Sequence, residues 1–104
     1  MATSPTQLSL KKLRADGYLV AITERWNAFA KIRQDMFGFI DLLAVKEGEI
    51  LAVQTTTASN MSARANKIAD SEHVGIVRKS GMKIHIHGWI KNGRKWECKV
   101  MDVS

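Results

Sequence analysis

The chain has 104 residues, of which 45% are hydrophobic; this length allows one modest core and excludes two ordinary domains, so we expect a single domain over residues 1–104. The 16 Lys and Arg residues against 10 Asp and Glu residues give a net charge of +6, which favours a polyanionic partner without identifying it. The single Cys98 excludes an intramolecular disulfide, and no apolar run is long enough to span a bilayer; we expect a cytoplasmic protein with no membrane role.

The N-terminal segment carries the signals of a short helix followed by a strand. Ser4-Pro5-Thr6-Gln7 places Ser at the N-cap, Pro at the first helical position and Gln at the third, which is a capping-box arrangement. Gly17 stands where a helix commonly ends in a left-handed residue. The run from Tyr18 to about Glu24 is β-branched and apolar, so the first strand is predicted there.

The next part of the chain predicts a loop and then a hairpin. Residues 27–36 show no clear period and mix charged with apolar side chains, which favours a loop. Residues 37–45 are mostly apolar around Asp41, a turn follows at 46–49, and residues 50–57 form another apolar run. We therefore expect the second and third strands to pair antiparallel.

The C-terminal half predicts helices and then a second hairpin. Ser59 or Asn60 can cap a helix, and a second helical piece is expected over residues 72–80. Strands are expected over residues 82–90 and 95–103, because an Asn-Gly turn lies between two alternating segments. The predicted order is helix, three strands, one helix or a pair, and two strands, which is an α/β domain with a sheet covered by helices.

An acidic residue lies inside an apolar run at Asp41. Burying a carboxylate without compensation is costly, so other groups must stabilise it. Two interpretations stay open: a carboxylate at a sheet edge that is hydrogen-bonded or paired with an Arg, and a ligand for a hard divalent cation. Gln54 ends the apolar run on the partner strand, so the two side chains are expected to meet at one end of the sheet. With a nearby backbone carbonyl, they form part of the oxygen ligand set that Mg²⁺ accepts.

A family resemblance accompanies this pattern. Asp41 on one strand, the turn Lys46-Glu47-Gly48-Glu49 and the run from Ile50 to Thr56 resemble the PD-(D/E)xK nuclease superfamily, and within it the archaeal-type Holliday junction resolvases. The resemblance covers roughly residues 18–70. It implies a restriction-endonuclease-like fold, with a mixed central sheet of about five strands flanked by helices in the order α-β-β-β-α-β-β.

The superfamily motif gives expected roles to several residues. An acid on the first hairpin strand binds the metal there, and an acid-x-Lys tripeptide on the second strand adds a ligand and a lysine near the attacking water. By motif position, Asp41 matches the first acid, Gln54 the second acid and Thr56 the lysine, and Thr55 between them is the candidate backbone ligand. Gln54 keeps an oxygen donor but lacks the charge, and Thr56 has no ammonium to stabilise a nucleophilic water.

Other residues can supply what the motif lacks. Glu24 and Asp35 are the candidates for a further metal-binding acid, because the first helix offers only Asp16 near its end. Lys67, on the helix that follows the motif, is the natural substitute for the motif lysine.

Basic residues near these positions are candidates for contacts with nucleic acid. Arg33, Arg64 and Lys67 can hold backbone phosphates. For Arg64 and Lys67 the alternative is an ordinary solvated charge on a helix. For Arg33 the alternative is a surface pair with Asp35, which contributes little to stability.

The last two strands carry histidines and tryptophans. His85 and His87 alternate and therefore share a face; we expect a solvated or substrate-facing role for them rather than a zinc site, since no further His or Cys lies close in sequence. Trp89 and Trp96 are expected to face each other across the hairpin as packing residues, with base stacking as the alternative for an exposed Trp.

The resemblance implies an Mg²⁺- or Mn²⁺-dependent endonuclease that cuts DNA phosphodiesters, including those of branched DNA such as Holliday junctions. Two alternatives stay open: a nucleic-acid-binding module that has lost catalysis through Gln54 and Thr56, and a protein-interaction domain whose basic residues are spread evenly. A homodimer is expected, because 104 residues offer little surface for gripping a duplex and the related resolvases act as dimers.

Overall fold

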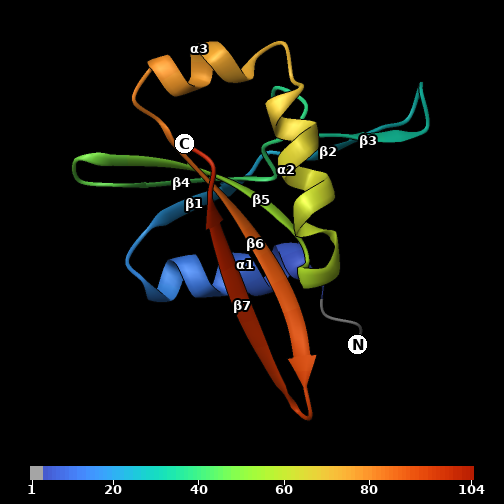
Figure 1. Cartoon of the computed structure of the whole chain (residues 1–104), viewed down its shortest axis with the longest axis vertical. Helices are drawn as coiled ribbons and strands as arrows, with labels where there is room; N and C mark the ends of the chain where they lie inside the picture. Colours follow the sequence, from blue (N-terminus) through green and yellow to red (C-terminus); the bar gives the residue numbers. More distant parts are fainter. Residues whose placement is uncertain (1–3) are drawn as a thin grey trace.

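A computed structural model describes residues 4–104 and places five strands in one mixed sheet with helices on both faces (Figure 1). The strand order is β1-β4-β5-β6-β7; β5 and β6 are parallel, and the other neighbouring pairs of that sheet are antiparallel. The predicted α/β class with a mixed sheet of five strands is confirmed. The elements are α1 (Pro5–Ala15), β1 (Leu19–Ile22), β2 (Arg25–Asn27), β3 (Ile32–Gln34), β4 (Leu42–Lys46), β5 (Glu49–Thr57), a 3-10 turn (Ala58–Asn60), α2 (Met61–Ala69), α3 (Val74–Lys79), β6 (Lys83–Asn92) and β7 (Lys95–Asp102).

Helix α1 begins and ends where its capping residues predict. Ser4 Oγ accepts a hydrogen bond from the backbone N–H of Gln7 at 3.2 Å, and Pro5 occupies the first turn, where its missing N–H has no intrahelical partner to lose. Gly17 has a φ of +92°, the left-handed conformation that ends the helix without Cβ strain.

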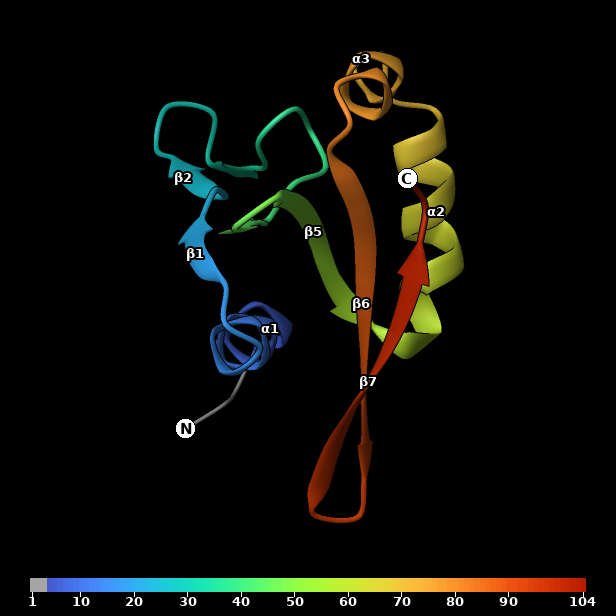
Figure 2. The ribbon, with the colours of Figure 1, turned by 90° about the vertical axis from the view of Figure 1, so that its left-hand side faces the viewer.

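Helix α1 lies on one side of the sheet, and α2 and α3 lie on the other (Figure 2). The side chains of β5 alternate between two apolar cores, one on each face. The core beneath α1 comprises Leu10, Leu13, Val20, Leu42, Ala44, Leu51 and Val53. The core beneath α2 and α3 comprises Phe39, Ile40, Ala52, Met61, Ile68, Val74, Val77, Ile84 and Ile86. Because residues two apart on a strand share a face, Gln54 lies on the α2 side with Ala52, and Thr55 lies on the α1 side with Val53.

Helices α2 and α3 form the predicted pair between β5 and β6. Asn60, one of the two predicted caps, is the N-cap residue of α2, although its side chain makes no capping hydrogen bond. Gly81 follows α3 with a φ of +87° and lets the chain turn into β6. This helical crossover is what allows β5 and β6 to run parallel. No helix within residues 4–104 is long and apolar enough to cross a membrane.

The prediction of a loop over residues 27–36 is wrong, because this segment completes a short ribbon. β2 and β3 pair antiparallel outside the main sheet, with Trp26 opposite Arg33. The side-chain oxygen of Asn27 stabilises the turn by accepting hydrogen bonds from the backbone N–H groups of Phe29 and Ala30 at 3.0 and 3.1 Å. Strands of 3 residues that bury little apolar surface leave no alternating pattern to detect.

Strand β4 begins later than the apolar run predicts. Phe37 and Gly38 have positive φ values of +56° and +83°, so the chain turns at this point instead of extending. Met36 and Ile40 form an isolated antiparallel bridge around the turn. Asp41 consequently lies immediately before β4 and not in the middle of a strand.

The C-terminal hairpin has the predicted Asn-Gly turn but not the predicted pairing of tryptophans. A turn over residues 91–94 would place Trp89 opposite Trp96. The turn is two residues shorter, so Trp89 is opposite Cys98 and Trp96 is opposite Lys91. Trp89 is buried, as expected of a packing residue, whereas Trp96 is exposed.

Candidate functional site

Three carboxylates from separate segments meet at one end of the main sheet. Glu24 follows β1, Asp35 follows β3 and Asp41 precedes β4, and one oxygen of each lies within 4.8 Å of the others. The backbone fixes Asp41 there, because its N–H donates to the Val53 carbonyl at 2.9 Å and its carbonyl accepts the N–H of Thr23 at 2.8 Å. The carboxylates line a cavity of about 300 Å³ whose other lining residues are Pro5, Thr6, Arg33, Gln54, Thr55, Arg64 and Lys67.

Asp41 is the most buried of these acids, with 4% of its surface exposed. Its Oδ2 accepts three hydrogen bonds: from Gln54 Nε2 at 3.0 Å, from the Thr55 backbone N–H at 2.8 Å and from the Thr55 hydroxyl at 3.2 Å. Burial raises the pKa of Asp41 to about 7; the Thr55 N–H opposes this shift, and the neighbouring carboxyls of Asp35 and Glu24 add to it. Ionising Asp41 at this site therefore costs free energy unless a cation accompanies it.

Gln54 meets Asp41 at the end of the sheet, as the hairpin predicts. The register pairs Leu42 with Val53, so Asp41 and Gln54 are the next residues along their two strands. Gln54 is 2% exposed, and its Oε1 is buried without a hydrogen-bond partner among the described residues. Because the amide N–H₂ is directed to Asp41, the amide oxygen is the free end of the side chain. A buried carbonyl oxygen without a donor needs a partner, and a cation is one.

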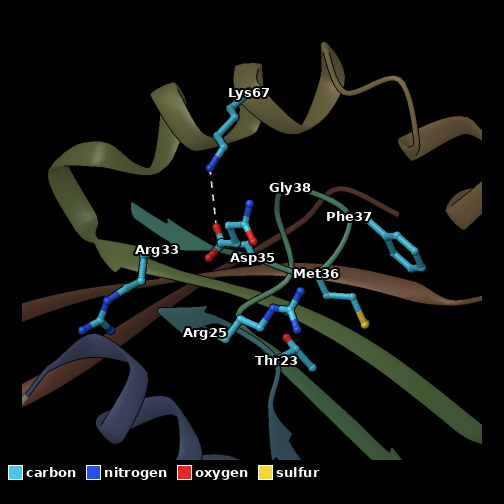
Figure 3. A pocket seen from close by; sticks show the side chains of 9 residues that line it. Thr23, Arg25, Arg33, Asp35, Met36, Phe37, Gly38 and Lys67 are labelled. Carbon is cyan, nitrogen blue, oxygen red and sulfur yellow. Dashed lines mark ion pairs between the residues drawn. The ribbon is translucent and has the colours of Figure 1, made fainter. Parts of the chain in front are cut away.

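Cationic side chains surround the three acids. Lys67 reaches from α2 to Asp35, with its Nζ 3.6 Å from Asp35 Oδ2 (Figure 3). Arg33 Nη1 lies 3.3 Å from Glu24 Oε1, and Arg64 lines the same cavity. The alternative of an Arg33–Asp35 surface pair is therefore wrong: each residue pairs with a different partner.

The side chains of Thr55 and Thr56 have different surroundings because they lie on opposite faces of β5. Thr55 holds Asp41 through both its N–H and its hydroxyl, a positioning role that its place in the motif does not indicate. Thr56 is buried, pairs with Gly88 of β6 and does not line the acidic cavity. The position that matches the motif lysine therefore contributes no side chain to the cavity.

Helix α1 contributes to the cavity through its first turn and not through its acid. Asp16 lies at the far end of α1, where it pairs with Lys12 at 3.5 Å. Thr6 Oγ1 lies 3.2 Å from Glu24 Oε1 and 3.0 Å from Thr55 Oγ1. The Thr6 hydroxyl therefore links α1 to residues on two sides of the cavity. The sequence gives no sign of this role, because it depends on how α1 lies across the sheet.

His87 is buried, so the expected solvated or substrate-facing role is wrong for this residue. Trp89 Nε1 donates to Ser9 Oγ at 2.8 Å, and Ser9 Oγ lies 2.9 Å from His87 Nδ1. Because the indole only donates, the Ser9 proton is available to a neutral His87 imidazole. The pKa of His87 is lowered to about 4, mainly by burial and to a smaller extent by the positive charges of Lys12 and His85.

Comparisons of the chain with protein-family models, curated proteins and solved structures give no match. What the site can do therefore follows from its donor atoms. Carboxylate oxygens with an amide oxygen are the ligand set of a hard divalent cation, and softer metals prefer sulfur or imidazole ligands. Glu24, Asp35, Asp41 and Gln54 can hold such an ion, and the adjacent Arg and Lys side chains can hold a phosphate.

Proposed function

We propose that the protein is an Mg²⁺- or Mn²⁺-dependent endonuclease of the PD-(D/E)xK type that acts on DNA phosphodiesters. The observation that carries this proposal is the convergence of Glu24, Asp35 and Asp41 beside the unpartnered amide oxygen of Gln54. Two features of the fold are consistent with the resemblance of residues 18–70 to that superfamily. The sheet contains one parallel pair of strands, and one hairpin presents Asp41 and Gln54 together.

The acids supply the charge that Gln54 lacks at its motif position. A divalent cation, when bound, polarises a scissile phosphate and makes a nearby water more acidic. Glu24, Asp35 and Asp41 would hold it together with Gln54 Oε1. Thr55 keeps Asp41 oriented through two hydrogen bonds, so the carboxylate enters the site already positioned.

Lys67 takes the place of the motif lysine in this proposal. Thr56 does not line the cavity, whereas the Lys67 ammonium enters it from α2 and lies 3.6 Å from Asp35. A substrate phosphate that enters the cavity meets this ammonium together with Arg33 and Arg64, which are the groups available to hold it. All three cations belong to segments outside the hairpin that carries the motif.

A nucleic-acid-binding module without catalysis is the second candidate. The observation that favours it is the saturation of Asp41 Oδ2 by three hydrogen-bond donors, together with the neutral Gln54. A protein-interaction domain with evenly spread charge is less well supported, because Arg25, Arg33 and Lys67 line one cavity beside the acids.

Cleavage assays with matched variants test the proposal. Supercoiled, single-stranded and branched DNA, with RNA as a comparison, are incubated with the protein in Mg²⁺, Mn²⁺ or EDTA. We expect metal-dependent cutting of DNA that Asp41→Asn abolishes, while binding in EDTA stays within about threefold of the unaltered protein. Circular dichroism of the variant checks that the fold is intact. Salt-sensitive binding without any cutting would favour the binding module, and absence of binding would reject both.

A further inference from the structure

The β2–β3 ribbon exposes large aromatic side chains. Phe29 is 100% exposed at its tip and Trp26 is 62% exposed on β2. The ribbon is a separate two-stranded sheet that extends away from the main sheet (Figure 1). A ribbon of this size has no apolar core of its own that these aromatic side chains could stabilise. Exposed aromatic side chains beside the candidate site instead indicate a contact surface.

The charge of the ribbon restricts the chemistry of its partner. Residues 25–34 contain Arg25, Lys31 and Arg33 and no acidic residue. Trp26 is directly opposite Arg33 in the register, and both line one cavity beside Glu24. A ligand that satisfies both must carry negative charge and flat apolar surfaces at short intervals. A nucleic-acid strand with accessible bases has both.

The cavities beside the ribbon lead to the acidic cluster. A cavity of about 300 Å³ is lined by Arg25, Trp26, Phe29 and Gln34, among others. Arg25 and Gln34 also line a cavity of about 780 Å³ that includes Asp35 and Lys67 (Figure 3). Asp35 and Lys67, with Arg33, in turn line the cavity that holds Asp41 and Gln54. Shared walls thus connect the exposed aromatic residues with the candidate metal ligands.

We infer that the β2–β3 ribbon binds unpaired nucleotides, with bases stacked on Trp26 and Phe29 and phosphates held by Arg25 and Arg33. The inference rests on the proposed function, since it places the strand that leads to the cleavage site. Bases within a continuous duplex are already stacked on their neighbours, so their faces are closed to an aromatic side chain. The preferred substrate is therefore single-stranded or locally unpaired nucleic acid.

Binding measured in EDTA tests the inference separately from catalysis. Fluorescence anisotropy is recorded for a labelled single strand, for the matching duplex and for a forked duplex with unpaired arms. The single strand and the fork are expected to bind about tenfold more tightly than the duplex. Trp26→Ala and Phe29→Ala should each weaken binding of the single strand about tenfold, as expected for the loss of one base–aromatic stack, and leave the duplex unchanged.

Two further variants control for loss of an aromatic ring as such. Trp26→Phe keeps a stacking face and should restore most of the affinity. Trp96→Ala removes another exposed Trp, which lies beside Lys91 on the far hairpin, and should leave binding of the single strand unchanged. Equal weakening by Trp96→Ala would show that the ribbon has no special part and would overturn the inference.

Other outcomes also overturn it. Unchanged affinity of Trp26→Ala for the single strand, or an equal loss on single strand and duplex, rejects stacking of unpaired bases. If light scattering shows that Trp26→Ala only dissociates a dimer, the ribbon is an interface between copies of the chain. Failure of the nuclease proposal is distinguishable, because it appears as absence of metal-dependent cutting while the preference for unpaired strands persists in EDTA.

Discussion

Gln54 donates its side-chain N–H to Asp41 Oδ2 at 3.0 Å and thereby leaves its own Oε1 buried without a partner in the described part of the chain. An ionised carboxylate at position 54 could not donate this bond. The pair therefore works differently from two acids: the glutamine reduces repulsion beside Asp41 and presents a neutral oxygen. In the proposed metal site, Glu24 and Asp35 would supply the negative charge that accompanies Asp41.

Gln54→Glu should raise the affinity for Mn²⁺ and lower the stability of the metal-free protein. The change adds a carboxylate to a site where burial already raises the pKa of Asp41 to about 7, so we expect a loss of about 2 kcal/mol in the free energy of unfolding in EDTA. A tenfold gain in Mn²⁺ affinity would return about 1.4 kcal/mol at saturating ion. Thermal unfolding with and without Mn²⁺ measures both terms. Gln54→Leu, which removes Oε1, is the matched control and should reduce the stabilisation by Mn²⁺. Equal stabilisation of the unaltered protein, Gln54→Glu and Gln54→Leu by Mn²⁺ would contradict a metal role for residue 54.

Lys67→Ala should impair cleavage more than binding. The ammonium lies 3.6 Å from Asp35 at the edge of the acidic cavity, where it can stabilise charge on a reacting phosphate. We expect a loss of about 100-fold in the single-turnover cleavage rate and a much smaller change in affinity. Lys79→Ala, at the end of α3, is a control outside the cavity. If Lys67 only contacts a phosphate, the variant will instead bind less tightly and the salt dependence of binding will fall by about one ion.

Titration of His87 should lower the stability of the protein as the pH falls from 7 to 5, against the opposite contribution of Asp41, whose pKa is raised to about 7 in the folded protein. The pKa of His87 is about 4 in the folded protein, mainly because of burial, against an ordinary value of 6.5, so between these values the unfolded state binds more protons. The free energy of unfolding should drop by about 2 kcal/mol between pH 7 and pH 5 from this group alone. Urea denaturation at several pH values measures the slope. The difference in the free energy of unfolding between the unaltered protein and His87→Gln, which does not titrate, should therefore change by about 2 kcal/mol from pH 7 to pH 5, and a constant difference would show that His87 does not contribute.

Gly88→Ala should destabilise the contact between β6 and α2. A Cβ at this position would overlap the side chain of Met61 and lie 3.1 Å from the Cα of Ala58. We expect a loss of about 1–3 kcal/mol in the free energy of unfolding, as for other overpacked sites. Gly75→Ala in α3 is the control, since nothing lies within 4 Å of its added Cβ and a small gain from helix propensity is expected. In a double-mutant cycle, Met61→Ala should recover part of the loss; strict additivity would place the strain elsewhere.

The sequence by itself determined the elements whose signals are local. Ser4 and Gly17 fix the ends of α1 because a cap and a positive φ depend on a few neighbouring residues. The contact between Asp41 and Gln54 was also predictable, because a short turn sets the register of an antiparallel hairpin. The turn at Gly93 is two residues shorter than the pattern predicts, so the cross-strand partners of Trp89 and Trp96 differ from the expected ones.

The sequence indicated Glu24, Asp35 and Lys67 only as candidates, and the tertiary structure decided that these residues and Thr6 complete the site. These residues come from four separate elements: Thr6 from α1, Glu24 from the end of β1, Asp35 from the end of the ribbon and Lys67 from α2. Only the packing of these elements on the sheet brings them to Asp41. The burial of His87 against Ser9 has the same origin. Such contacts depend on the crossing of helices over a sheet and on the positive φ values at residues 37 and 38. No short pattern along the chain predicts them, because the free energy that stabilises them comes from burial shared among many residues.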